Sequence, residues 1–335
     1  MSAHTARVIA YFDQCLDDYR RFWGLDRHLS MHAGFYDARH RSHAAAMDNA
    51  NRVLADLAGV RPGERVLDAG CGVGGSAMWL ARHAGAEVVG VNIHPAQVEI
   101  ARKHAARRRL GHRASFRLAD YLDTGLPGES FDVVWALESV AHAPDKRDFL
   151  REAWRLLKPG GRLIVSDVFL TRPCRTRAEE RAVRGWCDGW AVPDLVRAER
   201  FAAWAAEAGF GGVRFLDATP LVRPASRRML LLAVALYPWA RALQGLGLRT
   251  RVQTGNVAAA YYQYRIGRSG LGVYGILLAR RPGADRRCPP RGRGDGVRGN
   301  EGDRPGSAGD RRTGPDDRGE GRHQRADRRP RCAGP

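Results

Sequence analysis

The sequence predicts an α/β fold: a mostly parallel, seven-stranded sheet with helices on both faces, and N-terminal and inserted C-terminal helices that form a lid. Three observations predict it. Short apolar runs alternate with amphipathic segments of helical length between residues 65 and 170. A glycine-rich turn follows the first of these runs. A long stretch of helical character, at about 220–268, separates the last two runs, where it can cover one edge of the sheet.

Each element follows from a local pattern. Strands are expected at the runs rich in Val, Ile, Leu and Phe, which are 65–69, 87–91, 114–118, 131–137, 162–169, 213–218 and 272–280. Helices are expected at 76–83, 96–109, 146–157, 199–208, 225–243 and 257–266. Pro159-Gly160-Gly161 forms a turn that ends the third of these helices, and Gly209 ends the fourth. Such a Rossmann-like sheet binds ligands at the carboxyl ends of its strands.

Composition argues against several classes of protein. No stretch of roughly 18 apolar residues is present, and the N-terminus lacks the basic and then apolar pattern of a secretion signal, so we expect a cytoplasmic protein. The six cysteines contain no CxxC pair, which predicts free thiols and no metal site. The net charge of +19 comes almost entirely from arginine, as a GC-rich coding sequence produces, without interleaved aromatic residues. We therefore expect no specific nucleic acid as a partner.

Residues 283–335 differ from the rest of the chain. Val297 is their only branched aliphatic residue, and they contain no aromatic residue. A segment of this composition cannot bury enough apolar surface to fold, so we expect a disordered tail rich in Arg, Gly and Pro. The alternative is a functional tail that contacts RNA or anionic lipid, which would make the chain an RNA-binding protein instead of an enzyme.

The glycine-rich turn indicates the cofactor. In the segment 64–75, Gly70, Gly72 and Gly75 fit the GxGxxG pattern of dinucleotide-binding proteins, and Gly74 adds a further glycine. Asp68 stands two residues before the first glycine, and a carboxylate there would repel a diphosphate. S-adenosylmethionine instead brings an ammonium and a sulfonium group, which the carboxylate attracts. The turn therefore favours S-adenosylmethionine over a nicotinamide cofactor.

The next strand ends are expected to bind the rest of this cofactor. Asn92 replaces the acidic residue that a nicotinamide protein uses for its ribose, and Asn92, Ile93 and Gln97 are expected beside the ribose. Asp120 either accepts the adenine amino group or caps a turn. Tyr121 and Leu122 are expected to flank the adenine ring, and Leu137 is a further expected contact of the cofactor.

These motifs resemble class I S-adenosylmethionine-dependent methyltransferases over about residues 64–170, including Leu157-Lys158-Pro159-Gly160-Gly161. Two groups within that class are similar in further segments. Tyr11-Phe12-Asp13, Tyr19 and Trp23-Gly24, together with 138–145, resemble sterol C-methyltransferases. His32-x-Gly34-Phe35-Tyr36 and the segment 138–146 resemble tocopherol methyltransferases.

The resemblance implies a small, apolar acceptor (isoprenoid, sterol-like or polyketide-like) that is methylated on carbon, or else a secondary metabolite methylated on oxygen or nitrogen. Glu138 is expected to stabilise a cation or act as a base, and His142 is the second catalytic candidate; the alternatives are an exposed carboxylate and a residue that caps the loop. The acceptor is expected to contact Tyr11, Tyr19, Trp23, His32, Phe35 and Tyr36, with a second wall from Trp239, Tyr261, Tyr262 and Tyr264. The alternative for the N-terminal aromatic residues is a helix that only docks on the domain.

We therefore divide the chain into an N-terminal helical lid segment (1–60), a methyltransferase domain (61–282) with an acceptor cap at about 220–268, and the tail. Residues 229–240 of the cap are apolar and flanked by Arg227, Arg228 and Arg241. They either pack into the domain or contact a membrane surface transiently. The expected oligomeric state is a monomer or a homodimer.

Overall fold

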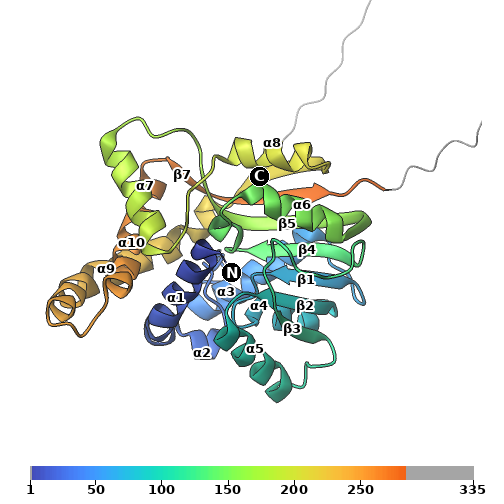
Figure 1. Ribbon diagram of the computed structural model, residues 1–335, viewed down its shortest axis with the longest axis horizontal. Coiled ribbons are helices and arrows are strands. Elements are labelled where there is room, and N and C mark those ends of the chain that lie inside the picture. The colour runs from blue at the N-terminus through green and yellow to red at the C-terminus, as the bar shows by residue number, and fades with distance from the viewer. Residues whose placement is uncertain (1, 284–335) are drawn as a thin grey trace, which may run out of the picture. The chain divides into compact units, whose positions relative to one another are not determined.

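The computed structural model describes residues 2–283, so the expected tail lies, from residue 284 on, outside the described residues. Seven strands form one sheet in the order β3-β2-β1-β4-β5-β7-β6 (Figure 1). The strands are β1 (Arg65–Ala69), β2 (Glu87–Asn92), β3 (Ala114–Leu118), β4 (Phe131–Leu137), β5 (Leu157–Leu170), β6 (Gly211–Asp217) and β7 (Gly272–Arg280). β1 to β5 pair in parallel, whereas β7 is antiparallel to both β5 and β6. The predicted fold class is confirmed.

Ten α-helices surround the sheet in the described part of the chain. They are α1 (Ala3–Asp18), α2 (Leu25–His28), α3 (His43–Ala58), α4 (Gly75–Trp79), α5 (Pro95–Arg107), α6 (Lys146–Leu156), α7 (Arg177–Gly189), α8 (Ala198–Glu207), α9 (Thr219–Gly245) and α10 (Arg251–Arg268). A π-helical turn, Tyr19–Trp23, continues α1. Within residues 2–283, no helix combines the length and the apolarity that a membrane span needs.

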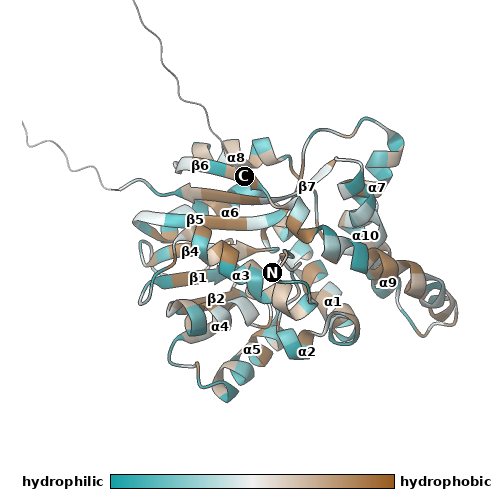
Figure 2. Cartoon of the chain, turned by 180° about the vertical axis from the view of Figure 1, so that it is seen from behind, coloured by the Kyte–Doolittle hydropathy of each residue, from teal (hydrophilic) through white to brown (hydrophobic). Residues whose placement is uncertain are grey.

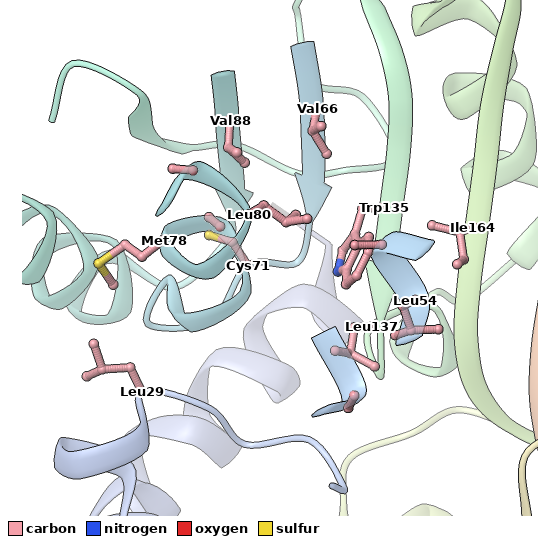
Figure 3. Packing of buried hydrophobic residues seen from close by; sticks show 14 of the residues in the cluster. Leu29, Leu54, Val66, Cys71, Met78, Leu80, Val88, Trp135, Leu137 and Ile164 are labelled. Carbon is pink, nitrogen blue, oxygen red and sulfur yellow. The ribbon is translucent and has the colours of Figure 1, made fainter. Parts of the chain in front are cut away.

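The core forms two layers because side chains of a buried strand point alternately to either face. On one face, α3, α4 and α5 cover Val133 and Trp135 of β4 and Val66 of β1. Figure 3 shows Trp135 beside Leu54 of α3 and Ile164 of β5. On the other face, α6 and α8 cover the alternate residues of the same strands. Since β1 and β4 are buried on both faces, apolar residues stand at adjacent positions in them, as in Val66-Leu67 and Val133-Val134-Trp135.

The start of β5 differs from the prediction. We expected a turn at residues 159–161 and a strand from residue 162, but the strand begins at Leu157, which pairs with Phe131. The register shifts before Arg162 pairs with Val133. Gly160, at φ +80°, donates its N–H to the carbonyl of Arg281 at 3.0 Å. The turn is thus a bulge in β5, held by the residue that follows β7.

Two helices lie where the sequence showed little regularity. α7 is rich in arginine and has few apolar positions, and it packs against α10 instead of against the sheet. α3 falls within the expected N-terminal lid segment, yet it packs on the sheet through Leu54 and Ala55 and lines no part of the large cavity described below. The N-terminal residues that line the cavity therefore all precede α3.

The packing of α6 predicts a large difference between two leucine truncations. Leu150→Ala removes a fully buried side chain between α6 and the sheet. It should lower the free energy of unfolding by about 2–5 kcal/mol. Leu118→Ala is the matched control, because Leu118 is 55% exposed on β3. Urea unfolding followed by circular dichroism compares the two variants. Equal losses of stability would contradict the assigned core.

Candidate active site

One large cavity of ≈ 270 Å³ opens at the carboxyl ends of β1, β2 and β4. The sheet and its loops form its floor, while α1, the following π-helical turn, α7, α9 and α10 form its opposite wall. The cavity has two compartments of different chemistry. Polar side chains from the strand ends line the floor, and aromatic and aliphatic side chains from the helices line the wall.

Asp68 at the end of β1 is the most constrained group of the floor. The residue is 2% exposed, and its Oδ2 has no hydrogen-bond partner among the described residues. Burial raises the pKa of this carboxyl to about 7. A buried, unpaired carboxylate is costly unless a donor or a cation meets it. The site therefore fits a cationic ligand, such as an ammonium group.

The glycine turn beside Asp68 is shaped for close contacts. Gly70 and Gly72 line the cavity with φ values of +84° and +54°, which other residues adopt only with strain. A Cβ at Gly70 would lie 2.5 Å from the Cβ of Ser139, in the loop after β4. The Ser139 hydroxyl donates to the carbonyl of Ala69 at 2.6 Å and fixes this approach.

Gly74, which was expected to contact the cofactor, has a packing contact in this turn. It does not line the cavity; a Cβ on Gly74 would lie 2.7 Å from the ring of Phe116, so its glycine serves the packing of the turn against β3. Gly75 lines the cavity instead, and a Cβ there would lie 2.1 Å from the carbonyl oxygen of Leu29. The backbone of the glycine turn therefore packs directly against the backbone around Leu29.

The predicted ribose residues lie together at the end of β2. Asn92, Ile93 and Gln97 all line the cavity. The Asn92 amide donates to the carbonyl of Gly72 at 3.2 Å and to Gln97 Oε1 at 2.8 Å. Both bonds are donated by the Asn92 amide, which therefore supports the glycine turn. They leave Gln97 Nε2, a buried donor without a partner, as the group available to a hydroxyl of the ligand.

Asp120, Tyr121, Leu122 and Leu137 lie beside these groups and line the cavity as expected. Asp120 Oδ1 accepts the N–H of Leu122 at 2.9 Å, so the residue also caps its turn. Tyr121 donates its hydroxyl to the carbonyl of Ser139 at 2.8 Å, and its ring packs edge-on against Phe149 at 5.8 Å. Both contacts hold the ring in place at the rim of the cavity.

Glu138 lies where the two compartments meet. Its φ of +50° turns the chain sharply after β4. Oε1 accepts the N–H of Ala33 and the hydroxyl of Tyr274, each at 2.7 Å. Burial raises the pKa of this carboxyl to about 7. No hydrogen bond within residues 2–283 uses Oε2, so one oxygen is positioned and the other is available to a ligand.

Two histidines face the same space in the neutral form. Burial lowers the pKa of His142 to about 4, and its Nδ1 is buried without a partner. Burial also lowers the pKa of His32 to about 4. His32 Nδ1 lies 2.9 Å from the carbonyl of Ala33, while Nε2 has no partner. Both rings line the cavity, and both retain one unused nitrogen.

The aromatic wall comes largely from the first turns of the chain. Tyr11, Tyr19 and Trp23 line the cavity as predicted, as do Phe12 and Phe22. The Tyr11 hydroxyl lies 2.8 Å from that of Tyr19 and donates to Asn256 of α10 at 2.9 Å. Asp18 forms a buried ion pair with Arg249, which precedes α10. The N-terminal helix is therefore fastened to the inserted helices across the mouth of the cavity.

Phe35 and Tyr36, which were expected to contact the acceptor, do not line the cavity. Phe35 is fully buried and packs edge-on against Tyr274 at 5.9 Å. The backbone N–H of Tyr36 donates to the carbonyl of Leu221, and its hydroxyl lies 3.3 Å from His43 Nδ1. Both residues tie the N-terminal segment to the domain, which gives them a packing role.

The C-terminal wall of the cavity consists of other residues than those expected. Trp239, Tyr261, Tyr262 and Tyr264 do not line the cavity, and Trp239 is 72% exposed. The wall consists of residues of α9 and α10 that the sequence did not single out: Met229, Leu232, Ala233, Leu236, Asn256, Val257, Ala260 and Gln263. Trp186 and Trp190 of the unpredicted α7 region complete it.

Asp167 is a further functional candidate that the sequence analysis missed. This β5 residue lines the cavity and accepts the N–H groups of Ala141 and Val168 at 2.9 and 2.8 Å. Burial raises its pKa to about 6. A lone carboxylate inside the apolar run 163–170 was the available signal, because a strand interior seldom holds a charge without a purpose.

Comparison with known proteins agrees with this geometry. Residues 67–165 match the family model of a methyltransferase domain. The chain is 33% identical over 283 residues to 27-O-demethylrifamycin SV methyltransferase of Amycolatopsis mediterranei (strain S699), covering 81% of this chain and 95% of that protein. It is 33% identical over 235 residues to 24-methylenesterol C-methyltransferase 2 of Oryza sativa subsp. japonica, covering 69% of this chain and 63% of that protein.

A solved structure with the same fold is that of the [4+2]-cyclase SpnF. It superposes with a TM-score of 0.69 at 25% identity, over 83% of this chain and 96% of that chain. The likeness extends over the sheet and the added helices, since the matched share exceeds the 67–165 segment.

The unpartnered carboxylate predicts pH-dependent cofactor binding. Asp68 must be ionised to attract a cation, and its pKa of about 7 means that protons compete below that pH. The affinity for S-adenosylmethionine should fall by up to about tenfold per pH unit below neutrality. Asp68→Asn should bind weakly and show little of this dependence in calorimetry at pH 6 and pH 8. Glu138→Gln is the control that should keep it. An Asp68→Asn variant with wild-type affinity and slope would refute the assignment.

Proposed function

The chain belongs to the S-adenosylmethionine-dependent methyltransferases, and from this premise we propose that it methylates a carbon atom of a small, apolar acceptor of isoprenoid, sterol-like or polyketide-like character. The observation that carries the proposal is the aromatic compartment, with the buried carboxyl of Glu138 at its inner end. Aromatic faces attract a cation, and a carboxylate can both stabilise the cation and remove a proton from it.

The polar floor fits the cofactor of this family. Asp68 Oδ2 and Gln97 Nε2 are buried and without partners, so the floor offers one anionic acceptor and one neutral donor. They would hold the ammonium group and a ribose hydroxyl, respectively, while Asp120 would accept the adenine amino group. When bound, S-adenosylmethionine supplies an electrophilic methyl group.

The chain's own groups then act on the acceptor. Addition of a methyl group to an alkene carbon leaves the acceptor with one positive charge and one proton to lose. The rings of Tyr11, Phe12, Tyr19, Trp186 and Trp190 surround the space where that charge would develop. Oε2 of Glu138 takes the proton, because the Ala33 N–H and the Tyr274 hydroxyl already hold Oε1. The apolar side chains of the wall offer water few hydrogen-bond partners, and water would otherwise capture the cation.

Methylation of an oxygen is the second candidate, and His142 is the observation that favours it. Burial keeps the imidazole neutral down to a pH of about 4, and its buried Nδ1 has no partner. A neutral imidazole of this kind can accept the proton of an acceptor hydroxyl. The similarity to the rifamycin O-methyltransferase along 95% of that protein agrees with this candidate. The two candidates thus differ in the base that they use.

Glu138→Gln should slow turnover by about 100-fold or more, because the amide cannot accept a proton. Cofactor affinity should change little, since Asp68 and Gln97 are untouched. The wild-type rate should rise with pH up to about 7 and then level off, because Glu138 acts as a base only when ionised. Single-turnover rates measured from about pH 5.5 to about pH 8.5, on both sides of this pKa, give the profile. An unchanged rate in the variant would remove Glu138 from the mechanism.

Product analysis distinguishes the two candidates. Labelled methyl groups from S-adenosylmethionine should appear in carbon–methyl products of alkene-containing isoprenoids and not in methyl ethers of a phenol panel. His142→Asn should retain most of this activity. If label appears only in ethers, and His142→Asn abolishes it while Glu138→Gln does not, oxygen is the methylated atom.

A further inference from the structure

The helix α9 has two apolar faces with different surroundings. Met229, Leu232, Ala233 and Leu236, at spacings of three and four residues, line the cavity. Leu231 and Val234 lie between them in sequence, yet they are 70% and 60% exposed. The middle of α9, residues 229–240, is apolar on every side, and a helical segment of this kind is expected to be covered all round. The described chain covers only the inner face of α9.

Further apolar side chains are exposed along the rest of α9 and in the turn that follows it. Together with Leu231 and Val234 they form what we call the outer patch: Leu231, Val234, Tyr237, Trp239, Leu243, Leu246 and Leu248. Trp239, Leu246 and Leu248 are 72%, 72% and 74% exposed. Figures 1 and 2 show the α9–α10 hairpin that carries the outer patch projecting beyond the edge of the sheet. Side chains of this size are seldom exposed together on a surface without a partner.

Charge indicates the kind of partner. The segment 219–268 contains eight arginines and no aspartate or glutamate. Arg227 and Arg241 are exposed on α9 beside the outer patch. Each therefore places a positive charge beside apolar side chains, and within residues 2–283 neither has a salt-bridge partner. An apolar surface edged by cations complements an anionic lipid surface.

We propose that the outer patch docks on an anionic phospholipid bilayer, with its leucines and Trp239 in the headgroup region and with Arg227 and Arg241 on the phosphates. Indole rings favour this interface, because they are both apolar and polar. The inner face of the same helix lines the acceptor compartment, so docking brings that compartment to the membrane in which an apolar acceptor dissolves. The inference rests on the proposed apolar acceptor.

Two other occupants fit less well. A second copy of the same surface would bring Arg227 and Arg241 against two more such cations, and the segment 219–268 offers no carboxylate to meet them. The residues from 284 on contain no aromatic residue and only one branched aliphatic residue, and arginine outnumbers acidic residues among them. They therefore offer neither the apolar side chains nor the charge that the outer patch requires.

Vesicle flotation of the full chain tests the inference. The protein should float with vesicles of phosphatidylcholine and phosphatidylglycerol, less as salt rises, and hardly with phosphatidylcholine alone. The double variants Leu246→Ser/Leu248→Ser and Arg227→Glu/Arg241→Glu should each lower the bound fraction by about tenfold. Leu118→Ser and Arg107→Glu are matched controls on exposed positions of β3 and α5, and they should float as the wild type does.

Wild-type protein that does not float, or double variants that float as well as the wild type, would overturn the inference. A wild-type protein that forms a dimer and floats with no vesicle would also overturn the inference, if Leu246→Ser/Leu248→Ser converts that dimer to monomers. An assay of methyl transfer to an acceptor dissolved in detergent distinguishes a failure of this inference from a failure of the proposed function. The double variants should retain that transfer, because none of their residues lines the cavity. Flotation without any transfer would refute the proposed acceptor and leave the docking surface standing.

Discussion

A carboxylate buried at the end of a central strand, with one oxygen unpaired, constrains everything around it. Asp68 is 2% exposed and has no cationic side chain beside it. Burial of such a group costs several kcal/mol unless a partner arrives. The surrounding turn is arranged to admit that partner, since Gly70 and Gly72 leave room where side chains would stand and Ser139 fixes the neighbouring loop. A cationic amino-acid group satisfies this site, whereas a diphosphate would be repelled.

The two compartments of the cavity meet at Glu138, and the fold brings distant segments together to hold it. Ala33 comes from the N-terminal segment and Tyr274 from β7, the antiparallel strand inserted between β5 and β6. The same N-terminal segment is fastened to α10 through Asp18, Arg249 and Asn256. One stretch of chain therefore positions the Glu138 carboxyl, through Ala33, and joins the inserted helices, through Asp18.

Local sequence patterns predicted those elements whose bounds depend mainly on their own residues. The strands β1, β3, β4 and β7 have the expected bounds, because each is an apolar run between turns. Asp68, Asn92 and Glu138 could be singled out because they lie at, or directly after, the ends of such strands. Tyr274 and Asp167 could not, because their contacts depend on the packing of distant elements. The same holds for Phe35 and Tyr36: an aromatic pair near a predicted lid serves the core equally well, and only tertiary packing decides between the two.

Cofactor recognition is expected to depend on contact between Asp68 and a cationic group of the ligand. A crystal structure of the complex with S-adenosylhomocysteine tests this contact most directly. The amino-acid ammonium of that ligand should lie within hydrogen-bond distance of Asp68 Oδ2, directly or through one water, with the ribose beside Gln97 and the sulfur facing Glu138 and the aromatic wall. A ligand whose ammonium lies elsewhere while Asp68 keeps its unpaired oxygen would contradict the account.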